Sequence, residues 1–165
     1  MAVYVRVRLM RLAVRHTAWK RVATLVLEAA GEASSELSIE LIGDGRMRRL
    51  NREYRKKDRT TDVLAFAMRE SACPDESLLG DVVISVPTAR RQAKENGRAL
   101  DEELAWLLVH GVLHLCGYDH ERSDQEARRM RRREQHILRG LRPIPRLVTV
   151  PKAVAPLRRR SGKME

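Results

Sequence analysis

The chain has 165 residues, of which 43% are hydrophobic and 33% charged, so it has the size and composition of one globular domain and is not a wholly disordered protein. Its 33 Lys and Arg residues outnumber its 22 Asp and Glu residues and give a formal net charge of +11, which predicts a polyanionic partner, most often nucleic acid. No apolar run of 18 residues is present and two cysteines cannot form a disulfide framework, so we expect a soluble, cytoplasmic protein with no membrane partner.

The first forty residues predict a strand, a helix and a second strand. Apolar residues alternate with polar ones from Val3 to Leu9, which is the pattern of a strand with one buried side. Residues 16–30 carry apolar residues at helical spacing, and Gly31 is placed to end that helix. Alternation returns at residues 37–41, which therefore predict a second strand.

A short basic helix and two buried strands are expected next. Asp44 is predicted to cap the helix. The runs 63–68 and 78–86 are too continuously apolar for strands with one exposed side, and a polar loop containing Pro74 separates them. We therefore place both strands in the middle of the sheet.

The second half of the chain is predicted to be helical. Helices are expected over residues 87–97 and 100–116, and Ser123 with Glu126 forms a capping box for a last helix that runs through Arg139. Strands therefore come early in the chain and helices late. This order predicts the α+β class, as a single domain with one mixed sheet of about four strands covered by helices.

Residues 142–165 interrupt this pattern. They contain four prolines, no aromatic residue, and seven Lys or Arg residues against a single acidic residue, Glu165. Such a composition predicts disorder. The predicted organisation is therefore one domain over residues 1–141, followed by a disordered basic tail over residues 142–165.

Residues 110–120, with the sequence HGVLHLCGYDH, have the spacing of a metal site on a helix and the turn that follows it. His110 and His114 are four residues apart and lie on one face of the predicted helix. Gly117 permits a turn that brings His120 back to the same ion. Three nitrogen ligands leave a fourth position for water, which is the arrangement of catalytic zinc, and Zn²⁺ lowers the pKa of such a water to about 7.

Two other interpretations of this segment remain open. Isolated histidines on an apolar helix are commonly core residues, but three at ligand spacing favour one shared metal ion. The spacing also matches the metzincin zinc proteases, His-Glu-x-x-His-x-x-Gly-x-x-His, except that Gly111 replaces the glutamate that acts as general base. A protease remains an alternative only if a carboxylate from elsewhere in the chain replaces that glutamate.

A basic segment precedes the first of the two buried strands. Residues 46–59 contain eight Lys or Arg residues and two acidic residues. Part of this segment is a solvated helix face, but its charge density also suits salt-sensitive contacts with phosphate groups. An arginine directed at the metal could stabilise charge on a phosphodiester during cleavage.

Three blocks of the chain carry a family resemblance. They are LNxxYRxxDxxTDVLxF at residues 50–66, LLGD at residues 78–81 and HGxLHLxGYDH at residues 110–120, and the third has every defining position. Together they resemble the YbeY-type endoribonucleases of bacterial ribosomal RNA maturation. The family commonly has Ser where this chain has Ala65.

The resemblance implies both a reaction and the residues that perform it. His110, His114 and His120 would be the zinc ligands, and Arg55 and His114 the catalytic residues. The family has the α+β fold and acts on single-stranded RNA, in processing of the 3′ end of small-subunit rRNA and in ribosome quality control. We accordingly expect rRNA and the ribosome or its small subunit as partners, and no DNA substrate.

The leading hypothesis is therefore a zinc-dependent, single-strand-specific endoribonuclease. Asp81 and Asp119 are weaker candidates for orienting ligands or transferring protons, because turn formation or helix capping is the commoner role of such residues. A non-catalytic RNA-binding ribosome-assembly factor with structural zinc is the first alternative. A metzincin-like protease is the second.

Overall fold

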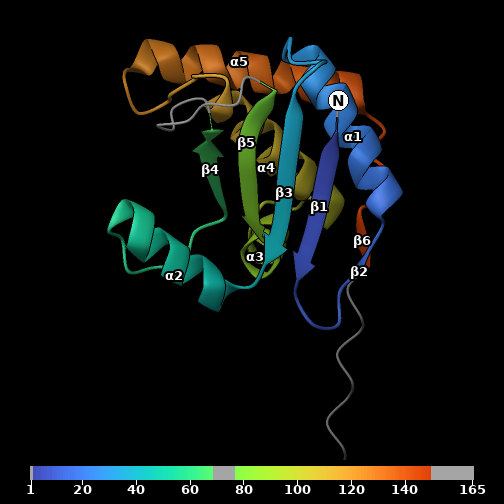
Figure 1. The fold of residues 1–165 in the computed structure, drawn as a ribbon, viewed down its shortest axis with the longest axis vertical. Coiled ribbons are helices and arrows are strands. Elements are labelled where there is room, and N and C mark those ends of the chain that lie inside the picture. Colours follow the sequence, from blue (N-terminus) through green and yellow to red (C-terminus); the bar gives the residue numbers. More distant parts are fainter. Residues whose placement is uncertain (1, 69–76, 150–165) are drawn as a thin grey trace, which may run out of the picture.

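A four-stranded mixed sheet lies at the centre of the computed structural model, which describes residues 2–68 and 77–149 (Figure 1). The strands follow the order β1-β3-β5-β4. β1, β3 and β5 run parallel, whereas β4 is antiparallel to β5. Their bounds are Val3–Arg8 (β1), Glu36–Ile42 (β3), Val63–Ala67 (β4) and Leu78–Ser85 (β5).

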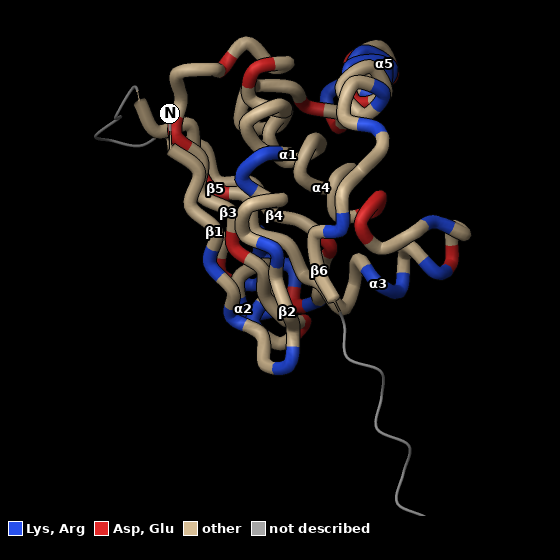
Figure 2. The backbone as a smooth tube through the Cα atoms, turned by 90° about the vertical axis from the view of Figure 1, so that its right-hand side faces the viewer, with Lys and Arg blue, Asp and Glu red and all other residues tan. Residues whose placement is uncertain are grey.

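Helices of the described chain pack mainly on one side of this sheet (Figure 2). Their bounds are His16–Ala29 (α1), Asp44–Arg55 (α2), Val86–Glu95 (α3), Leu100–Leu115 (α4) and Asp124–Leu141 (α5). α1 and α4 contact the sheet, α5 packs on α1 and α4, and α2 lies near the carboxyl ends of the parallel strands. The predicted α+β class is confirmed. No helix among the described residues is both long enough and apolar enough to cross a membrane.

α4 is the central helix of the fold. It has the sheet on one side and α3 and α5 on others, which explains why its sequence is apolar nearly all round. Its side chains join those of α1 and the sheet in one large apolar core. Because interiors of this kind are closely packed, the C-terminal end of α4 is a rigid platform for the side chains that it presents.

The two apolar runs expected in the middle of the sheet occupy different positions. β5 lies between β3 and β4 and is largely buried, as predicted. β4 is an edge strand in which only Leu64 is buried, so its predicted central place is wrong. Other apolar residues of β4 line the cleft described below, and a cleft wall has the same apolar composition as a core strand. The loop predicted around Pro74 lies outside the described residues.

Residues 142–149 belong to the ordered fold. Leu147 is fully buried, and Val148–Thr149 (β6) pairs antiparallel with Ala13–Val14 (β2). The ordered chain therefore continues beyond the predicted domain boundary. Local sequence could not reveal this, because a two-residue strand depends on a partner far away in the chain. The rest of the predicted tail, residues 150–165, lies outside the described residues.

Candidate metal centre

The last turns of α4 and the turn after it bring three histidines together. His110 and His114 are one helical turn apart, and both are partly buried. α4 ends at Leu115, and Gly117 takes a φ of +95°, a left-handed conformation that favours glycine. The N–H of Gly117 donates to the carbonyl of His114 at 3.0 Å. The chain thus reverses direction and returns His120 to the other two imidazoles.

The imidazole nitrogens are spaced as ligands of one ion. Nε2 of His114 lies 3.1 Å from Nε2 of His110 and 3.1 Å from Nδ1 of His120. Nitrogen atoms bound tetrahedrally to zinc at about 2.0–2.1 Å are about 3.3 Å apart. Within residues 2–68 and 77–149, these histidines are the one group of three or more His, Cys or acidic side chains close enough together to hold a metal ion. The donor set fits zinc and neighbouring divalent transition metals.

Glu134 of α5 orients the first of these histidines. Its buried carboxylate accepts a hydrogen bond from Nδ1 of His110 at 2.5 Å. With the proton on Nδ1, the lone pair of His110 is on Nε2, the atom nearest to His114. A carboxylate in this position fixes both the ring orientation and the tautomer of a metal ligand.

The surroundings of His114 favour its neutral form. Burial lowers the pKa of His114 below its ordinary value, and the neighbouring His110 and His120 lower this pKa further. Metal ions bind the neutral imidazole, so the lowered pKa of His114 favours metal binding.

Gly111 permits α4 to approach the sheet closely. A Cβ atom at this position would lie 2.7 Å from Cγ1 of Val82 on β5, closer than real side chains come. A side chain at position 111 would therefore meet the sheet and could not stand beside the histidines. The structure gives a packing reason for the absence of the metzincin glutamate and leaves the protease hypothesis without its general base at that position.

An open cleft of about 640 Å³ adjoins the three histidines. It lies between β4, the C-terminal half of α4 and the turn that precedes α5. Trp106 lines it, together with the carboxylates of Asp62, Asp119 and Glu121. A recess of this volume is large enough for a ligand of nucleotide size.

Arg55, the last residue of α2, lines the same cleft. Its guanidinium lies 3.6 Å from the Glu121 carboxylate, and its side chain is 41% exposed. Lys56 ends the helix with a φ of +59°, and the N–H of the next residue, Lys57, donates to the carbonyl of Asn51 at 3.3 Å. The buried Asn51 side chain donates in turn to the carbonyl of Arg59 at 2.8 Å. The structure therefore brings the predicted arginine and the predicted metal ligands into one cleft.

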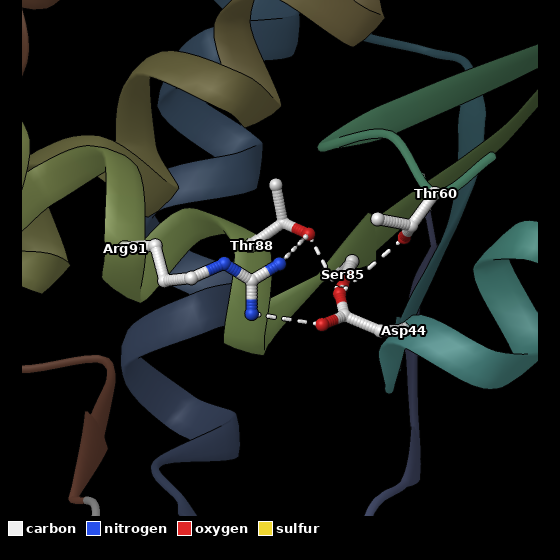
Figure 3. A network of polar contacts seen from close by, with 5 residues as sticks. All are labelled: Asp44, Thr60, Ser85, Thr88 and Arg91. Carbon is white, nitrogen blue, oxygen red and sulfur yellow. Dashed lines mark hydrogen bonds and ion pairs between the residues drawn. The ribbon is translucent and has the colours of Figure 1, made fainter.

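Asp44 fastens the other end of α2 (Figure 3). Gly43 holds the cap position, so the predicted capping role of Asp44 is wrong. The Asp44 carboxylate instead accepts hydrogen bonds from Ser85 at 2.7 Å, Thr88 at 2.6 Å and Arg91 at 2.8 Å. Burial by itself raises the pKa of Asp44, but these hydrogen bonds outweigh it and lower the pKa to about 2. The first turn of α2 is thereby joined to the end of β5 and to α3.

The two weaker acidic candidates lie in different places. Asp119 lines the cleft, and its carboxylate accepts the N–H of Glu121 at 2.9 Å, which is the contact of a turn-forming residue. Asp81 lies on β5 and lines a separate groove with Tyr4 and Phe66. It is not among the residues that line the metal cleft.

Two acidic residues that contact the predicted histidines and arginine were not predicted from the sequence. Glu134 was detectable in principle, because it lies on the buried side of α5 with Met130 and Ile137. A charged residue on the apolar side of a helix requires a partner, and here the partner is His110. Glu121 carried no such signal, since it is an exposed residue in a turn and meets Arg55 only through the tertiary fold.

Several known proteins match this sequence and fold. The family model of endoribonuclease YbeY matches residues 7–142. Endoribonuclease YbeY of Geobacter metallireducens is 49% identical over 121 residues, which cover 72% of this chain and 81% of that protein. Its counterpart from Aquifex aeolicus is 45% identical over 137 residues, which cover 83% of this chain and 91% of that protein. The solution structure of TM1509 from Thermotoga maritima matches with a TM-score of 0.57 and 21% identity, over 82% of this chain and 86% of that one, and supports the fold alone.

Proposed function

Since the chain belongs to the endoribonuclease YbeY family, we propose that it is a zinc-dependent endoribonuclease that cleaves phosphodiester bonds of single-stranded RNA. One observation carries the proposal: three imidazoles at ligand spacing and one arginine line a single open cleft. Each of these groups acts on an anionic substrate, the imidazoles through a metal ion and the arginine directly.

His110, His114 and His120 would hold the ion. When bound, it supplies Lewis acidity toward a phosphoryl oxygen and a water activated near neutral pH. The protein's part is to keep the donor atoms in place: Glu134 fixes His110, burial favours the neutral form of His114, and the turn at Gly117 returns His120.

Arg55 supplies a positive charge from the opposite wall of the cleft. Its planar guanidinium donates to two phosphate oxygens at once. The Glu121 carboxylate that it now contacts is 64% exposed, so this ion pair is weak and a phosphate group can replace it. The contact strengthens as negative charge increases on the phosphoryl oxygens, and it therefore lowers the barrier to cleavage.

The shape of the cleft supports a single-stranded substrate. The His110 side chain is only 16% exposed, so the phosphate to be cut must enter a recess. A flexible single strand enters such a recess without first losing base pairs. The indole of Trp106 lies 5.2 Å from the His110 ring and offers one surface on which a base can stack.

We assign this activity to ribosomal RNA in the cytoplasm. The substrate in this proposal is the 3′ end of small-subunit rRNA, and the partner is the ribosome or its small subunit, with a further role in ribosome quality control. Family membership and the net charge of +11 support these assignments.

The test compares wild-type protein with His114→Ala on a labelled single-stranded RNA, with the metal content of both proteins measured. The wild type is expected to hold about one zinc ion per chain and to cleave, whereas the variant loses both properties. His136→Ala is the matched control, because His136 is an exposed histidine of α5 outside the cleft. Unchanged cleavage by His114→Ala would refute the proposal. A wild-type protein that binds zinc and RNA but never cleaves would instead support the non-catalytic assembly factor.

A further inference from the structure

α5 carries a row of arginines that the proposed reaction does not use. Four of them are exposed and lie away from the side of the helix that packs on the core. We name them the α5 stripe: Arg128, Arg131, Arg132 and Arg139. At the rise of an α-helix the stripe is about 16 Å long.

The charge of the α5 stripe is not neutralised by the described part of the chain. Two other arginines of the helix have partners: Arg129 pairs with Glu126 at 3.7 Å, and Arg133 donates to the carbonyl of Ala29. The four stripe residues form no ion pair with any residue in 2–68 or 77–149. Like charges three or four positions apart on a helix repel one another, so an external polyanion would stabilise this face.

The stripe is rigidly connected to the metal centre. α5 begins at Asp124, just after Glu121 of the cleft, and its Glu134 contacts the ligand His110. Arg55 lines the other side of the cleft at the end of α2. α2 and α5 occupy opposite ends of the molecule in both views (Figures 1 and 2), and Figure 2 shows basic segments on both helices. An RNA that crosses the cleft therefore has basic surface on either side.

We propose that the α5 stripe binds the phosphate backbone of a double-helical RNA segment adjoining the single strand that enters the cleft. The inference rests on the proposed function for its class of substrate. α5 has no Phe, Tyr or Trp, whereas surfaces for single strands stack bases on aromatic rings. A surface that has arginines but no aromatic rings is suited to contacts with phosphate groups. Double-stranded RNA is recognised mainly through its backbone. A straight helix face also presents several guanidinium groups at once to a duplex of regular phosphate spacing.

The test replaces all four stripe arginines by glutamine, which removes the charge and retains high helix propensity. The matched control replaces four exposed cationic residues of α1 and α3 by glutamine: Lys20, Arg21, Arg90 and Lys94. Binding is measured with two cleavage-resistant RNA probes, a hairpin with a single-stranded extension and the extension alone. Thermal melting shows that each variant is folded.

The stripe variant is expected to bind the hairpin probe at least tenfold more weakly near 0.1 M salt and the extension alone less than threefold more weakly. The salt dependence of hairpin binding should also fall, by about 0.9 in the logarithmic slope for each phosphate that the protein no longer neutralises. The control variant should change either affinity less than threefold. Equal losses on both probes, equal losses in both variants, or no loss at all would overturn the proposal.

Two further measurements distinguish binding of duplex RNA from binding of a membrane, and distinguish failure of this proposal from failure of the proposed function. If the stripe variant loses binding to vesicles containing phosphatidylserine but keeps its affinity for the hairpin, the surface binds lipid and the proposal is wrong. Cleavage of a short single strand is measured alongside. If the wild type never cleaves but the stripe variant still loses affinity for the hairpin probe, the proposed function is wrong and the proposal of a duplex-binding surface is supported. If the wild type cleaves and the stripe variant binds the hairpin probe with unchanged affinity, only the proposal of a duplex-binding surface is wrong.

Discussion

The two walls of the cleft are held in place in different ways. The histidines stand on or just beyond α4, a helix packed on several sides, and Glu134 fixes one of them from a second helix. Arg55 is exposed at the end of α2, which is joined to the rest of the fold through Asp44 and a small apolar cluster. That cluster consists of Ile42, Met47, Leu64 and Val83.

The difference follows from what each wall must do. Three ligands bind one ion well only if their nitrogens are positioned beforehand, so a rigid and buried platform suits them. In the proposed reaction Arg55 exchanges the Glu121 carboxylate for a phosphate during each cycle, and an exposed, weakly paired side chain can do so. The comparison predicts that changes on the histidine side affect metal affinity and that changes on the arginine side affect turnover.

Arg55→Ala is the strongest test of this division. Loss of the guanidinium is expected to reduce kcat about 100- to 1000-fold, the range found when one transition-state donor is removed. Metal content and melting temperature should not change, because Arg55 makes only one weak ion pair. Arg52→Ala is the control, since Arg52 is an exposed arginine of the same helix outside the cleft. Normal turnover by Arg55→Ala would contradict a role for this arginine in the reaction.

Glu134→Ala is expected to affect metal binding on the histidine side of the cleft. Without the carboxylate, Nδ1 of His110 loses its acceptor and the ring is free to turn, so zinc affinity is expected to fall about 10- to 100-fold. Glu134→Gln retains an oxygen that accepts the same hydrogen bond and should recover most of the affinity. Competition titration with a chromogenic chelator measures the effect, and Glu126→Ala on the same helix is the control. Zinc affinity equal to that of the wild type in Glu134→Ala would show that His110 needs no such support.

Asp44→Asn tests how α2 is attached. The carboxylate has a folded-state pKa of about 2 against an ordinary value of 3.8, so it stabilises the fold above pH about 4, and the stabilisation is lost as pH falls through about 2. The Asp44 side chain is 34% exposed, so after solvent screening we expect a loss of about 1 kcal/mol at neutral pH. Activity should fall less than tenfold, since only the support of Arg55 is weakened.

Urea unfolding of wild type and Asp44→Asn between pH 2 and pH 7 measures this linkage. The difference in unfolding free energy should be constant above pH about 4 and shrink toward pH 2. Asp58→Asn is the control, because Asp58 also pairs with an arginine, Arg48, but is more exposed. A difference that stays the same down to pH 2 would show that the Asp44 charge is not its source.

Glu121→Gln should produce the smallest effect. It removes the carboxylate that competes with phosphate for Arg55, and exposed ion pairs of this kind contribute at most about 1 kcal/mol. The KM for single-stranded RNA is therefore expected to fall no more than about fivefold, with the difference disappearing at high salt. Asp124→Asn makes the same change in net charge at the start of α5, and an equal effect there would mean that charge alone, not Arg55, is responsible.

Much of this protein was predictable because the signals are local. Apolar spacing identified the main helices and strands of the described chain, and the interval of four residues put His110 and His114 on one helical face. Gly117 marked the turn that returns His120, because few residues other than glycine adopt its conformation readily. The charge count likewise indicated a polyanionic partner.

Only the tertiary structure decided how distant segments meet. β4 lies at the edge of the sheet rather than in its middle, Asp44 holds α2 to β5 and α3 rather than capping it, and Leu147 is buried beyond the predicted boundary. Glu134 reaches His110, and Glu121 reaches Arg55, only after the helices have packed. Periodicity reports which side of an element is buried but not what covers it, because the covering residues come from other parts of the chain. For that reason the clustering of the three histidines could be predicted from the sequence, whereas the contacts that Glu134 and Glu121 make in the cleft could not.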